Sequence, residues 1–520
     1  MLLFAAALSN AQDYTWAEHI APIVYKKCAS CHRNDGIAPF SMTSYEDAKN
    51  VAIAIKSAIE SKHMPPWPPD PSYNRLAHER ILTDEEKTAI FEWIAMGTAS
   101  GNLSQVPPLP DFPENGDLPG TPDLVLQIPT YTIQATTEDE YRCFSIKNTL
   151  TQDAFITAWE VVPGNRSAVH HVLVYQDETG QCASLDAANS EPGYQCFGSA
   201  CDGAEPFGAW APGGNPLTYP PGMGIRLKAG VDVIIEMHYP KGNAGEVDST
   251  ELHFFLSPAA GMREVFFDAV ADPWETNLNP PFTIPANQVK TFNTRLNFNF
   301  GADFTLLRVM PHMHLLGKSM EAWLDTPTPG VDTLKIIKIP KWDFHWQGMY
   351  ALPKLVRIKN GTKLNTRFTY DNTTANPNNP NFPPQTVFYG EATTDEMLFL
   401  FVEYLDYQPG DENIIFDSTA LISPAVEVPG EAHSSAMLLP CQPNPVRDFM
   451  SIPFYLPGTE EVSLEIFDLH GKLVATPLAK TSLPGGNHSV DFRGKLSPGL
   501  YFVQMACGSG ARKTSKFAAL

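Results

Sequence analysis

Charged residues are scarce in this sequence, and positive charge is scarcer than negative charge. Only 18% of the 520 residues are charged, and 36 Lys and Arg stand against 58 Asp and Glu, a formal net charge of −22. Because such a chain repels phosphate backbones, we expect no nucleic acid among its partners. After the N-terminus, no run reaches the roughly 18 apolar residues of a membrane-spanning helix. We therefore expect a mature protein that is soluble or attached to a surface.

The chain is too long to form a single hydrophobic core, and 520 residues predict three or four domains. Apolar residues make up 43%, which is typical of a globular protein. The 47 prolines and the many short Thr-, Val- and Phe-rich runs indicate turns between β-strands. The sequence therefore predicts a multidomain, mainly β protein.

The N-terminal residues MLLFAAALSNAQ have the apolar stretch and the small-residue site of a signal peptide, although the usual positive start is missing. We expect export, which makes disulfides reasonable for the six cysteines outside the CASCH motif. Cys441 and Cys507 could bridge the first and last strands of the last domain. The other four cysteines can form two disulfides in three different ways, and the sequence does not favour one of them. These cysteines are Cys143, Cys182, Cys196 and Cys201.

Residues 13–104 show the apolar spacing of helices, for example in YEDAKNVAIAIKSAIES and TDEEKTAIFEWIAMG. Thr83 and Glu86 form the pattern of a capping box at the start of the last helix, and Gly97 is a natural end for it. A proline-rich linker, residues 105–122, follows. The next roughly 300 residues consist of short strand-like segments, which indicate two β-sandwiches.

The helical region contains the motif CASCH, which fits the C-x-x-C-H pattern of covalent haem attachment. Cys28 and Cys31 would add to the haem vinyl groups, and the imidazole of His32 would bind the iron. A redox C-x-x-C or half of a zinc site is the alternative. Neither a βαβ pattern nor a second cysteine pair surrounds the motif, which favours haem c.

A second axial ligand must come from elsewhere in the chain. In HMPPW we favour Met64 over His63, because a rigid Pro-Pro segment suits the presentation of a sulfur atom. The region resembles small monohaem cytochromes c that have an MPPW loop and a final helix ending in W-x-x-x-G, here Trp93 to Gly97. Two further methionines are the other candidates: Met42 and Met96.

Five of the 14 histidines fall in three strand-like segments. His312 and His314, two residues apart, project from one face of a strand and can share a metal ion. His170 and His171 are adjacent, so they can bind one ion only where the strand twists or bulges. His238 lies in IEMHYP. Imidazole sites in an exported chain suit copper or zinc, and a thioether ligand favours copper.

Residues 123–425 resemble the copper type II, ascorbate-dependent monooxygenases. The resemblance is carried, in the family's order, by VHHVLVYQ, FGAWAPGGNPLTYPPGMGIRLKAG with MHYP, HMHLLGK and TTDEM. It implies two sandwich domains that each hold one copper and face each other across a solvent-filled cleft. It also implies an electron-transfer copper and a catalytic copper. The first would be bound by His170, His171 and His238, and the second by His312, His314 and Met397.

The sequence departs from the peptide-amidating branch of that family. Met310 stands where that branch has an Arg that grips the substrate carboxylate, and Phe399 and Phe401 replace its Asn and Tyr. A peptidylglycine substrate is therefore not expected, and the apolar replacements favour a less polar substrate. His345, in WDFHWQG, is interpreted as a structural or supporting histidine.

Residues 438–520 resemble the sorting domain of the type IX secretion system of Bacteroidota, through PNPVRDF, LEIFDLHGKLV and LSPGLYFVQM. An ordinary carbohydrate-binding β-sandwich is the alternative. The resemblance implies passage through the outer membrane by the type IX machinery, followed by secretion or retention at the cell surface. This localisation is consistent with the export expected from the N-terminus.

The sequence as a whole predicts an exported copper monooxygenase that hydroxylates a C–H bond of an unknown organic substrate with O₂. It would use two copper ions and one haem c, with electrons from the haem or from ascorbate. A surface copper-binding or electron-transfer protein without oxygenase activity and an adhesin are the alternatives. The expected parts are a signal peptide (1–12), a cytochrome c-like domain (13–104), a linker (105–122), two jelly-roll-like copper domains (123–260 and 261–425), a linker (426–437) and a sorting domain (438–520).

Overall fold

The computed structural model divides the chain into two compact units. One unit contains residues 1–74 and 79–414, and the other contains residues 75–78 and 415–520. The expected signal peptide and most of the second linker lie outside the described residues. The described residues are 14–34, 36–110, 118–196, 199–327, 333–417, 436–438, 441, 446, 449–468, 472–497, 499–510 and 512–519.

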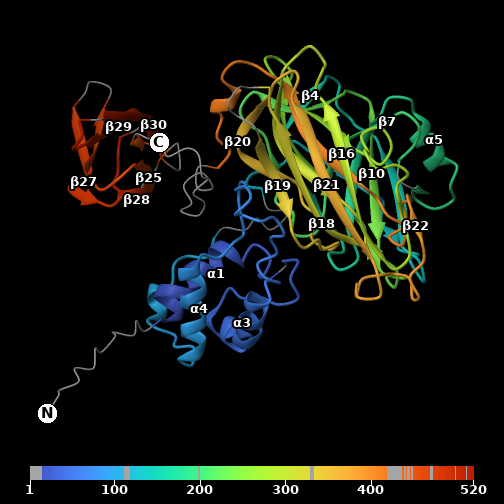
Figure 1. The fold of residues 1–520 in the computed structure, drawn as a ribbon, viewed down its shortest axis with the longest axis horizontal. Coiled ribbons are helices and arrows are strands. Elements are labelled where there is room, and N and C mark those ends of the chain that lie inside the picture. The colour runs from blue at the N-terminus through green and yellow to red at the C-terminus, as the bar shows by residue number, and fades with distance from the viewer. Residues whose placement is uncertain are drawn as a thin grey trace. The chain divides into compact units, whose positions relative to one another are not determined.

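Residues 14–110 form short helices, as the apolar spacing predicts. Thr83 and Glu86 make both hydrogen bonds of a capping box at the start of α4. The buried rings of Trp16 and Trp93, 6.1 Å apart, lie in the core that these helices share. In Figure 1 α1, α3 and α4 form one group. The helices are η1 Trp16–Ile20, α1 Ala21–Lys27, α2 Tyr45–Asn50, α3 Ala52–Glu60, α4 Asp84–Ala95 and η2 Leu103–Gln105.

The first sandwich packs two antiparallel sheets against each other. Phe207 of one sheet contacts Trp159 and Phe254 of the other, each at 6.3 Å between ring centroids. One sheet has the order β1-β12-β4-β9-β13, with β8 on β4, and the other has the order β6-β3-β10-β5-β7. The elements are β1 Leu124–Gln127, β2 Tyr131–Thr132, β3 Glu140–Ile146, β4 Ala154–Val162, β5 His171–Asp177, α5 Gln181–Ala187, β6 Tyr194–Gln195, β7 Ala204–Trp210, β8 Leu217–Thr218, β9 Met223–Leu227, β10 Asp232–Tyr239, β11 Val247–Asp248, β12 Glu251–Pro258 and β13 Arg263–Glu264.

Two disulfides lie in the first sandwich, at the end that carries α5. Cys143 is joined to Cys196, and Cys182 is joined to Cys201. The structure thus selects one of the three pairings that the sequence leaves open.

The suggested bridge between Cys441 and Cys507 is wrong, because both are buried free thiols in the structure. Cys441 lies on neither of the strands around it, and Cys507 ends the penultimate strand rather than the last one.

The second sandwich begins at Phe266, shortly after the expected boundary, since β13 still pairs with the first sandwich. Its sheets have the orders β14-β23-β17-β20 and β16-β21-β18-β19. Figure 1 shows β16, β18 and β21 side by side. The elements are β14 Phe266–Ala271, β15 Thr283–Ile284, β16 Gln288–Asn297, β17 Phe304–His312, β18 Gly317–Asp325, β19 Leu334–Ile339, β20 Tyr350–Ile358, β21 Lys363–Asn372, β22 Val387–Phe388, β23 Phe399–Asp406 and η3 Asp411–Asn413.

A buried ion pair fixes the two sandwiches to each other. Arg308 of β17 donates to the Glu403 carboxylate of β23 and to the Thr218 carbonyl of the first sandwich. The Tyr219 hydroxyl donates to the same carboxylate at 2.6 Å. The relative positions of the two sandwiches are therefore set by directional contacts.

The described residues from Met437 onward form β-strands and no helix. Their sheets have the orders β24-β25-β28 and β27-β26-β29-β30, and they enclose an apolar core. The expected mainly β fold is therefore confirmed. Among the described residues, no helix is long and apolar enough to cross a membrane. The strands are β24 Met437–Leu438, β25 Phe449–Leu456, β26 Glu460–Asp468, β27 Leu473–Leu483, β28 Gly486–Arg493, β29 Gly499–Cys507 and β30 Arg512–Ala519.

Candidate metal centres

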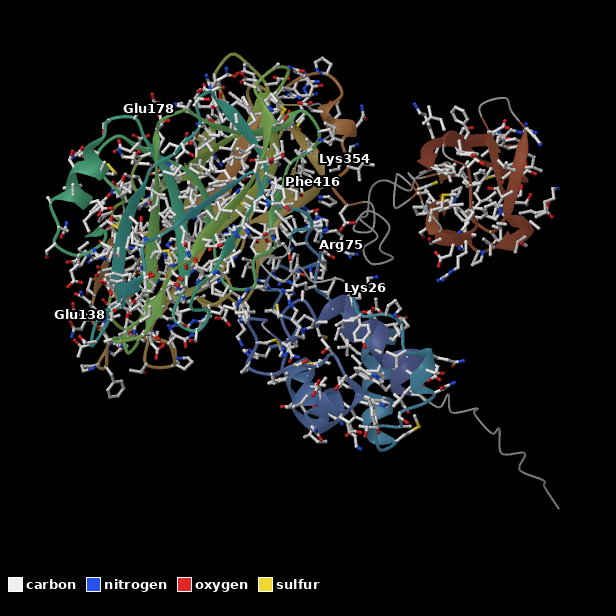
Figure 2. All side chains as sticks on the ribbon, turned by 180° about the vertical axis from the view of Figure 1, so that it is seen from behind. Lys26, Arg75, Glu138, Glu178, Lys354 and Phe416 are labelled. Atoms are coloured by element: carbon white, nitrogen blue, oxygen red, sulfur yellow. A yellow bond between two sulfur atoms is a disulfide. The ribbon has the colours of Figure 1, made fainter. Side chains whose placement is uncertain are left out.

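The first histidine set lies at one end of the first sandwich. His171 begins β5 and pairs in register with His238 of β10. His170 precedes β5, and its backbone N–H donates to the His238 carbonyl at 2.9 Å. Because His170 is outside the strand, strand alternation does not direct it away from His171. Figure 2 labels Glu138 at this end of the sandwich and Glu178, which follows β5, at the other end.

Three ring nitrogens converge in this set. The Nδ1 atom of His171 lies 3.2 Å from Nδ1 of His170 and 3.1 Å from Nδ1 of His238. A neutral imidazole nitrogen has one lone pair, so Nδ1 of His171 cannot accept a hydrogen bond from both neighbours. Burial lowers the pKa of each ring, that of His170 to about 3, so the lone pairs stay free of protons. A cation among the three rings would satisfy them.

Asp139, which the sequence gave no reason to select, orients one of these rings. Its Oδ2 atom lies 3.2 Å from Nε2 of His238 and accepts a hydrogen bond from the Thr393 hydroxyl at 2.8 Å. Burial alone would raise the pKa of Asp139, but the hydrogen bonds from His238, the Lys241 backbone and Thr393 hold it well below its usual value. The ionised carboxylate therefore keeps the proton of His238 on Nε2 and leaves Nδ1 to face the set.

The second set lies where β17 and β23 meet. β17 ends at His312, which pairs with Phe399 at the start of β23. His314 follows His312 by two residues and Met397 precedes Phe399 by two, and the Glu396 carboxylate accepts a hydrogen bond from the backbone N–H of each. The rings of His312 and His314 are 5.2 Å apart and perpendicular, at 89°. The two imidazoles are therefore neighbours, as the i, i+2 spacing predicts, and the role of Met397 as a third ligand stays a prediction.

Both imidazoles of the second set present Nε2. Nδ1 of His312 donates to Oε1 of Gln347 at 2.7 Å, and the Gln347 amide is oriented because its Nε2 donates to the Phe344 carbonyl. Nδ1 of His314 donates to the Asp395 carbonyl at 3.2 Å. Burial lowers the pKa of His312 to about 4 and that of His314 to about 3. The free lone pair of each ring is therefore on Nε2.

A buried carboxylate fixes the backbone of both segments that form the second set. Glu396 accepts backbone hydrogen bonds from His314 at 2.9 Å, Leu316 at 2.6 Å and Met397 at 3.3 Å. Burial raises the pKa of Glu396 to about 8, although these N–H donors act against the rise. The sequence analysis missed this residue, whose only signal is its place directly before Met397.

The two sets lie close together, and a single phenyl ring contacts both. Phe344 stacks on His170 at 4.9 Å and meets His314 edge-on at 5.9 Å, which limits the separation of these two rings to 10.8 Å. The bond from Thr393 to Asp139 adds a polar contact. Phe344 and the Thr393–Asp139 hydrogen bond therefore connect the two sets, and the solvent-filled cleft that the resemblance implies stays a prediction. His345 is exposed, and its ring is 5.8 Å from that of His170.

The CASCH motif begins at the end of α1. Cys28 and Cys31 are free thiols in a chain whose structure has disulfides elsewhere. The buried ring of His32 donates from Nδ1 to the Phe40 carbonyl at 3.1 Å, which leaves Nε2 unprotonated. Burial lowers the pKa of His32 and raises that of Cys28 to about 12.

The four candidates for a second axial ligand differ in exposure. Met64 is half-buried and His63 is exposed. Met42 is 4% exposed and belongs to the helical core, and Met96 is 40% exposed at the end of α4. The choice of Met64 is consistent with these exposures and stays a prediction.

Family comparisons agree with the positions of both sets. Residues 124–245 match the family "Copper type II ascorbate-dependent monooxygenase, N-terminal domain", and residues 285–419 match the C-terminal domain of the same name. The chain contains both copper type II monooxygenase domains. Residues 442–518 match a "Secretion system C-terminal sorting domain". The first histidine set lies in the N-terminal copper domain and the second in the C-terminal one.

Two vertebrate proteins are among the curated relatives of this chain. The chain is 31% identical over 107 residues to "DBH-like monooxygenase protein 1" of Gallus gallus and 32% identical over 105 residues to that of Homo sapiens. Each match covers 18% of this chain and only 16% of the relative.

Solved structures overlap this chain only weakly. PorZ, a surface component of the type IX secretion system of Porphyromonas gingivalis, is 22% identical and covers 16% of this chain and 11% of its own, with a TM-score of 0.13. Latent PorU from the same organism is 12% identical and covers 74% of this chain and 34% of its own, with a TM-score of 0.16.

In the C-terminal copper monooxygenase domain, an aromatic row continues from the second histidine set. Phe399 pairs with His312 and stacks on Phe401, and Phe401 stacks on Phe267 at 5.3 Å. Trp274, 59% exposed, lies 6.1 Å from Phe399. The apolar departures noted in the sequence therefore form one surface on the face of the sheet that carries His312.

Proposed function

We propose that this exported copper monooxygenase hydroxylates a C–H bond of an organic substrate with O₂, taking electrons from a fused c-type haem or from ascorbate. One observation carries the proposal: a set of three converging imidazole Nδ1 atoms and a neighbouring pair of imidazoles with free Nε2 atoms both contact one phenyl ring. A storage site does not need two sets of different composition, whereas a reaction that consumes two electrons does.

His170, His171 and His238 would hold one copper through Nδ1, and His312, His314 and Met397 would hold the other through Nε2 and sulfur. A thioether stabilises Cu(I), the state that reacts with O₂. When bound, the copper ions supply the O₂ activation and the two electrons that place one oxygen atom in the substrate and release the other as water.

The chain's own residues orient the ligands and limit water. Asp139 and Gln347 fix the tautomers of His238 and His312, and Glu396 holds the backbone beside Met397. Phe344 and Phe399 add apolar surface beside the second set. Reduced access of water protects a reactive oxidant from side reactions. The apolar row also favours a substrate with little charge.

The residues of the CASCH motif fit a covalent haem. Two unpaired thiols, three residues apart, precede an imidazole whose Nδ1 is already bonded and whose Nε2 is free. Cys28 and Cys31 would form the thioether links, with His32 and Met64 as axial ligands. The bound group would store single electrons. The sorting domain indicates that the protein is secreted or reaches the cell surface.

Metal analysis of purified holoprotein tests the ligand sets. We expect two coppers in the wild type, and one in each of His314→Ala and Met397→Ala. His345→Ala removes an exposed imidazole near His170 that belongs to neither set, and this control should keep two coppers. Retention of two coppers by both ligand variants would refute the second set.

Oxygen labelling separates the proposal from a surface copper-binding or electron-transfer protein. With ¹⁸O₂ and a panel of apolar substrates, the proposed enzyme incorporates one labelled atom into the product, and His314→Ala does not. A protein that binds two coppers and oxidises reductant without labelling any product would be an electron-transfer protein.

A further inference from the structure

Residues 67–74, which we name the strap, follow the Met64 loop and lie on the edge of a sheet in the C-terminal copper domain. The Asp70 backbone N–H donates to the Lys338 carbonyl at 2.8 Å, and the Asn74 amide donates to the Ile336 carbonyl at 2.8 Å. Both acceptors are on β19, the last strand of its sheet. Carbonyls two residues apart point to the same side of a strand. The strap therefore covers part of the free edge of β19.

Tyr73 strengthens this contact from the middle of the strap. Its ring lies under two ammonium groups of β19, at 5.0 Å from Nζ of Lys335 and 5.6 Å from Nζ of Lys338. A cation over the face of an aromatic ring is attracted by the negative charge density of that face. Arg80, which lies between the strap and α4, contacts the N-terminal copper domain, because it donates to the Gly213 carbonyl at 2.6 Å.

The start of the strap leads from Met64 toward the second metal set. Trp67, three residues after Met64, meets the buried ring of Tyr350 edge-on at 5.5 Å. Tyr350 begins β20 and pairs with Val309, three residues before His312 on β17. Gln347, three residues before Tyr350, accepts the Nδ1 hydrogen bond of His312.

We propose that the strap docks the Met64 loop on the C-terminal copper domain, and that Trp67 and Tyr350 form the contact through which an electron passes from the haem to the His312–His314–Met397 copper. The proposal rests on the haem and copper assignments of the proposed function. One electron leaves the reduced haem iron and reduces one Cu(II) to Cu(I), and an external one-electron donor such as ascorbate then reduces the haem again. The electron acceptor in this route is the second set and not the first.

Hydrogen exchange tests the docking without any cofactor. In the full-length apoprotein, the amide of Asp70 should be protected, and Tyr73→Ala together with Asn74→Ala should raise its exchange rate by about tenfold or more. Ser104→Ala, an exposed change outside the strap, is the control. An Asp70 amide that exchanges at the unprotected rate in the wild type would overturn the docking.

Anaerobic stopped-flow spectroscopy tests the electron route. Copper-loaded, oxidised holoprotein is mixed with limiting ascorbate, and haem absorbance is followed as the transiently reduced haem passes its electron to copper. Trp67→Leu and Tyr350→Leu should slow haem reoxidation on the order of tenfold, whereas Trp67→Phe and Tyr350→Phe should restore the rate. Phe382→Leu, which removes a 90% exposed aromatic outside the strap, should have no effect. If both Leu variants keep normal haem and copper contents and the wild-type rate of haem reoxidation, the electron route is overturned. The docking of the strap would not be affected by this result.

Variants of the two copper sets identify the acceptor. Haem reoxidation should persist in His171→Ala and be lost in His314→Ala, with copper EPR reporting which site is reduced. The opposite pattern would place the acceptor at the His170 set and overturn the route. Absence of covalent haem on a denaturing gel would overturn the haem assignment and the route together, while the exchange experiment would still decide the docking.

Discussion

Single residues decide which ring nitrogen each histidine offers to a metal. Asp139 binds Nε2 of His238, so Nδ1 faces the first set, whereas Gln347 binds Nδ1 of His312, so Nε2 faces the second. Both partners come from segments distant in sequence from the ring that they orient. The supporting residues thus give the two sets different geometries although both are rich in imidazole.

Replacement of the carboxylate beside His238 should weaken the first copper site. In Asp139→Asn the charge that favours the Nε2–H tautomer is lost, and we expect copper affinity at this site to fall by about 10–100-fold. Asp153→Asn, which removes a carboxylate paired with Arg226 in the same domain, is the matched control. Competitive titration with a Cu(I) chelator measures the change. Equal affinities for Asp139→Asn and the control would contradict the role of Asp139.

Another histidine, remote from both sets, should make stability depend on pH. His253 is buried with Nδ1 3.6 Å from Glu160 and Nε2 2.9 Å from Glu251, and these carboxylates raise its pKa above the usual value. Because the folded state holds the proton more tightly, the contribution is complete below the unfolded pKa and is lost as the pH rises through the folded pKa.

His253→Gln should therefore destabilise the protein more at pH 5.5 than at pH 9. Denaturant unfolding of both proteins at the two pH values measures the difference. A mutational effect that is larger at the higher pH would show that the charged form of His253 is not the stabilising one.

At the scale of elements, β17 and β23 carry the ion pair that joins the sandwiches, and the second set lies at their ends. Arg308 is four residues before His312, Glu403 is six residues after Met397, and both Arg308 and Glu403 are buried. Movement of either strand would therefore change the metal site and the domain contact together. The capping box of α4 and the strands around the five histidines could be predicted, because each depends on neighbours in the sequence.

Removal of one partner of the Arg308–Glu403 ion pair should lower the stability of the folded protein. Glu403→Leu leaves the Arg308 guanidinium buried without its carboxylate, and we expect a loss of about 3–5 kcal/mol in the free energy of unfolding. The double variant Arg308→Met with Glu403→Leu should recover most of that loss, because no charge is left buried. Asp303→Asn, which breaks the exposed pair with Arg357, should cost less than about 1 kcal/mol. Urea unfolding of the three variants measures the change in the free energy of unfolding. Equal losses for Glu403→Leu and Asp303→Asn would contradict the special cost of an unpaired buried charge.

At the scale of the whole molecule, the proposed haem and copper ligands come from separate segments with no shared residue. Cys28→Ser with Cys31→Ser should therefore abolish covalent haem and keep two coppers, and Met397→Ala should lose one copper and keep the haem. Haem staining after denaturing electrophoresis and elemental analysis measure the two contents. Loss of both coppers in the cysteine variant would show that the haem-binding helices are needed for the copper domains to fold.

The sequence by itself predicted the mainly β fold, and short-range spacing and motif chemistry selected the CASCH motif and the five histidines. Met397 was predicted only through the resemblance to the copper monooxygenases. Only the tertiary structure decided which cysteines pair and that Asp139, Gln347 and Glu396 support the metal sets. It also decided that Phe344 contacts both sets and that the strap lies along β19. These contacts join residues that are dozens to hundreds of positions apart, and their geometry depends on how the sheets pack, which no local pattern encodes.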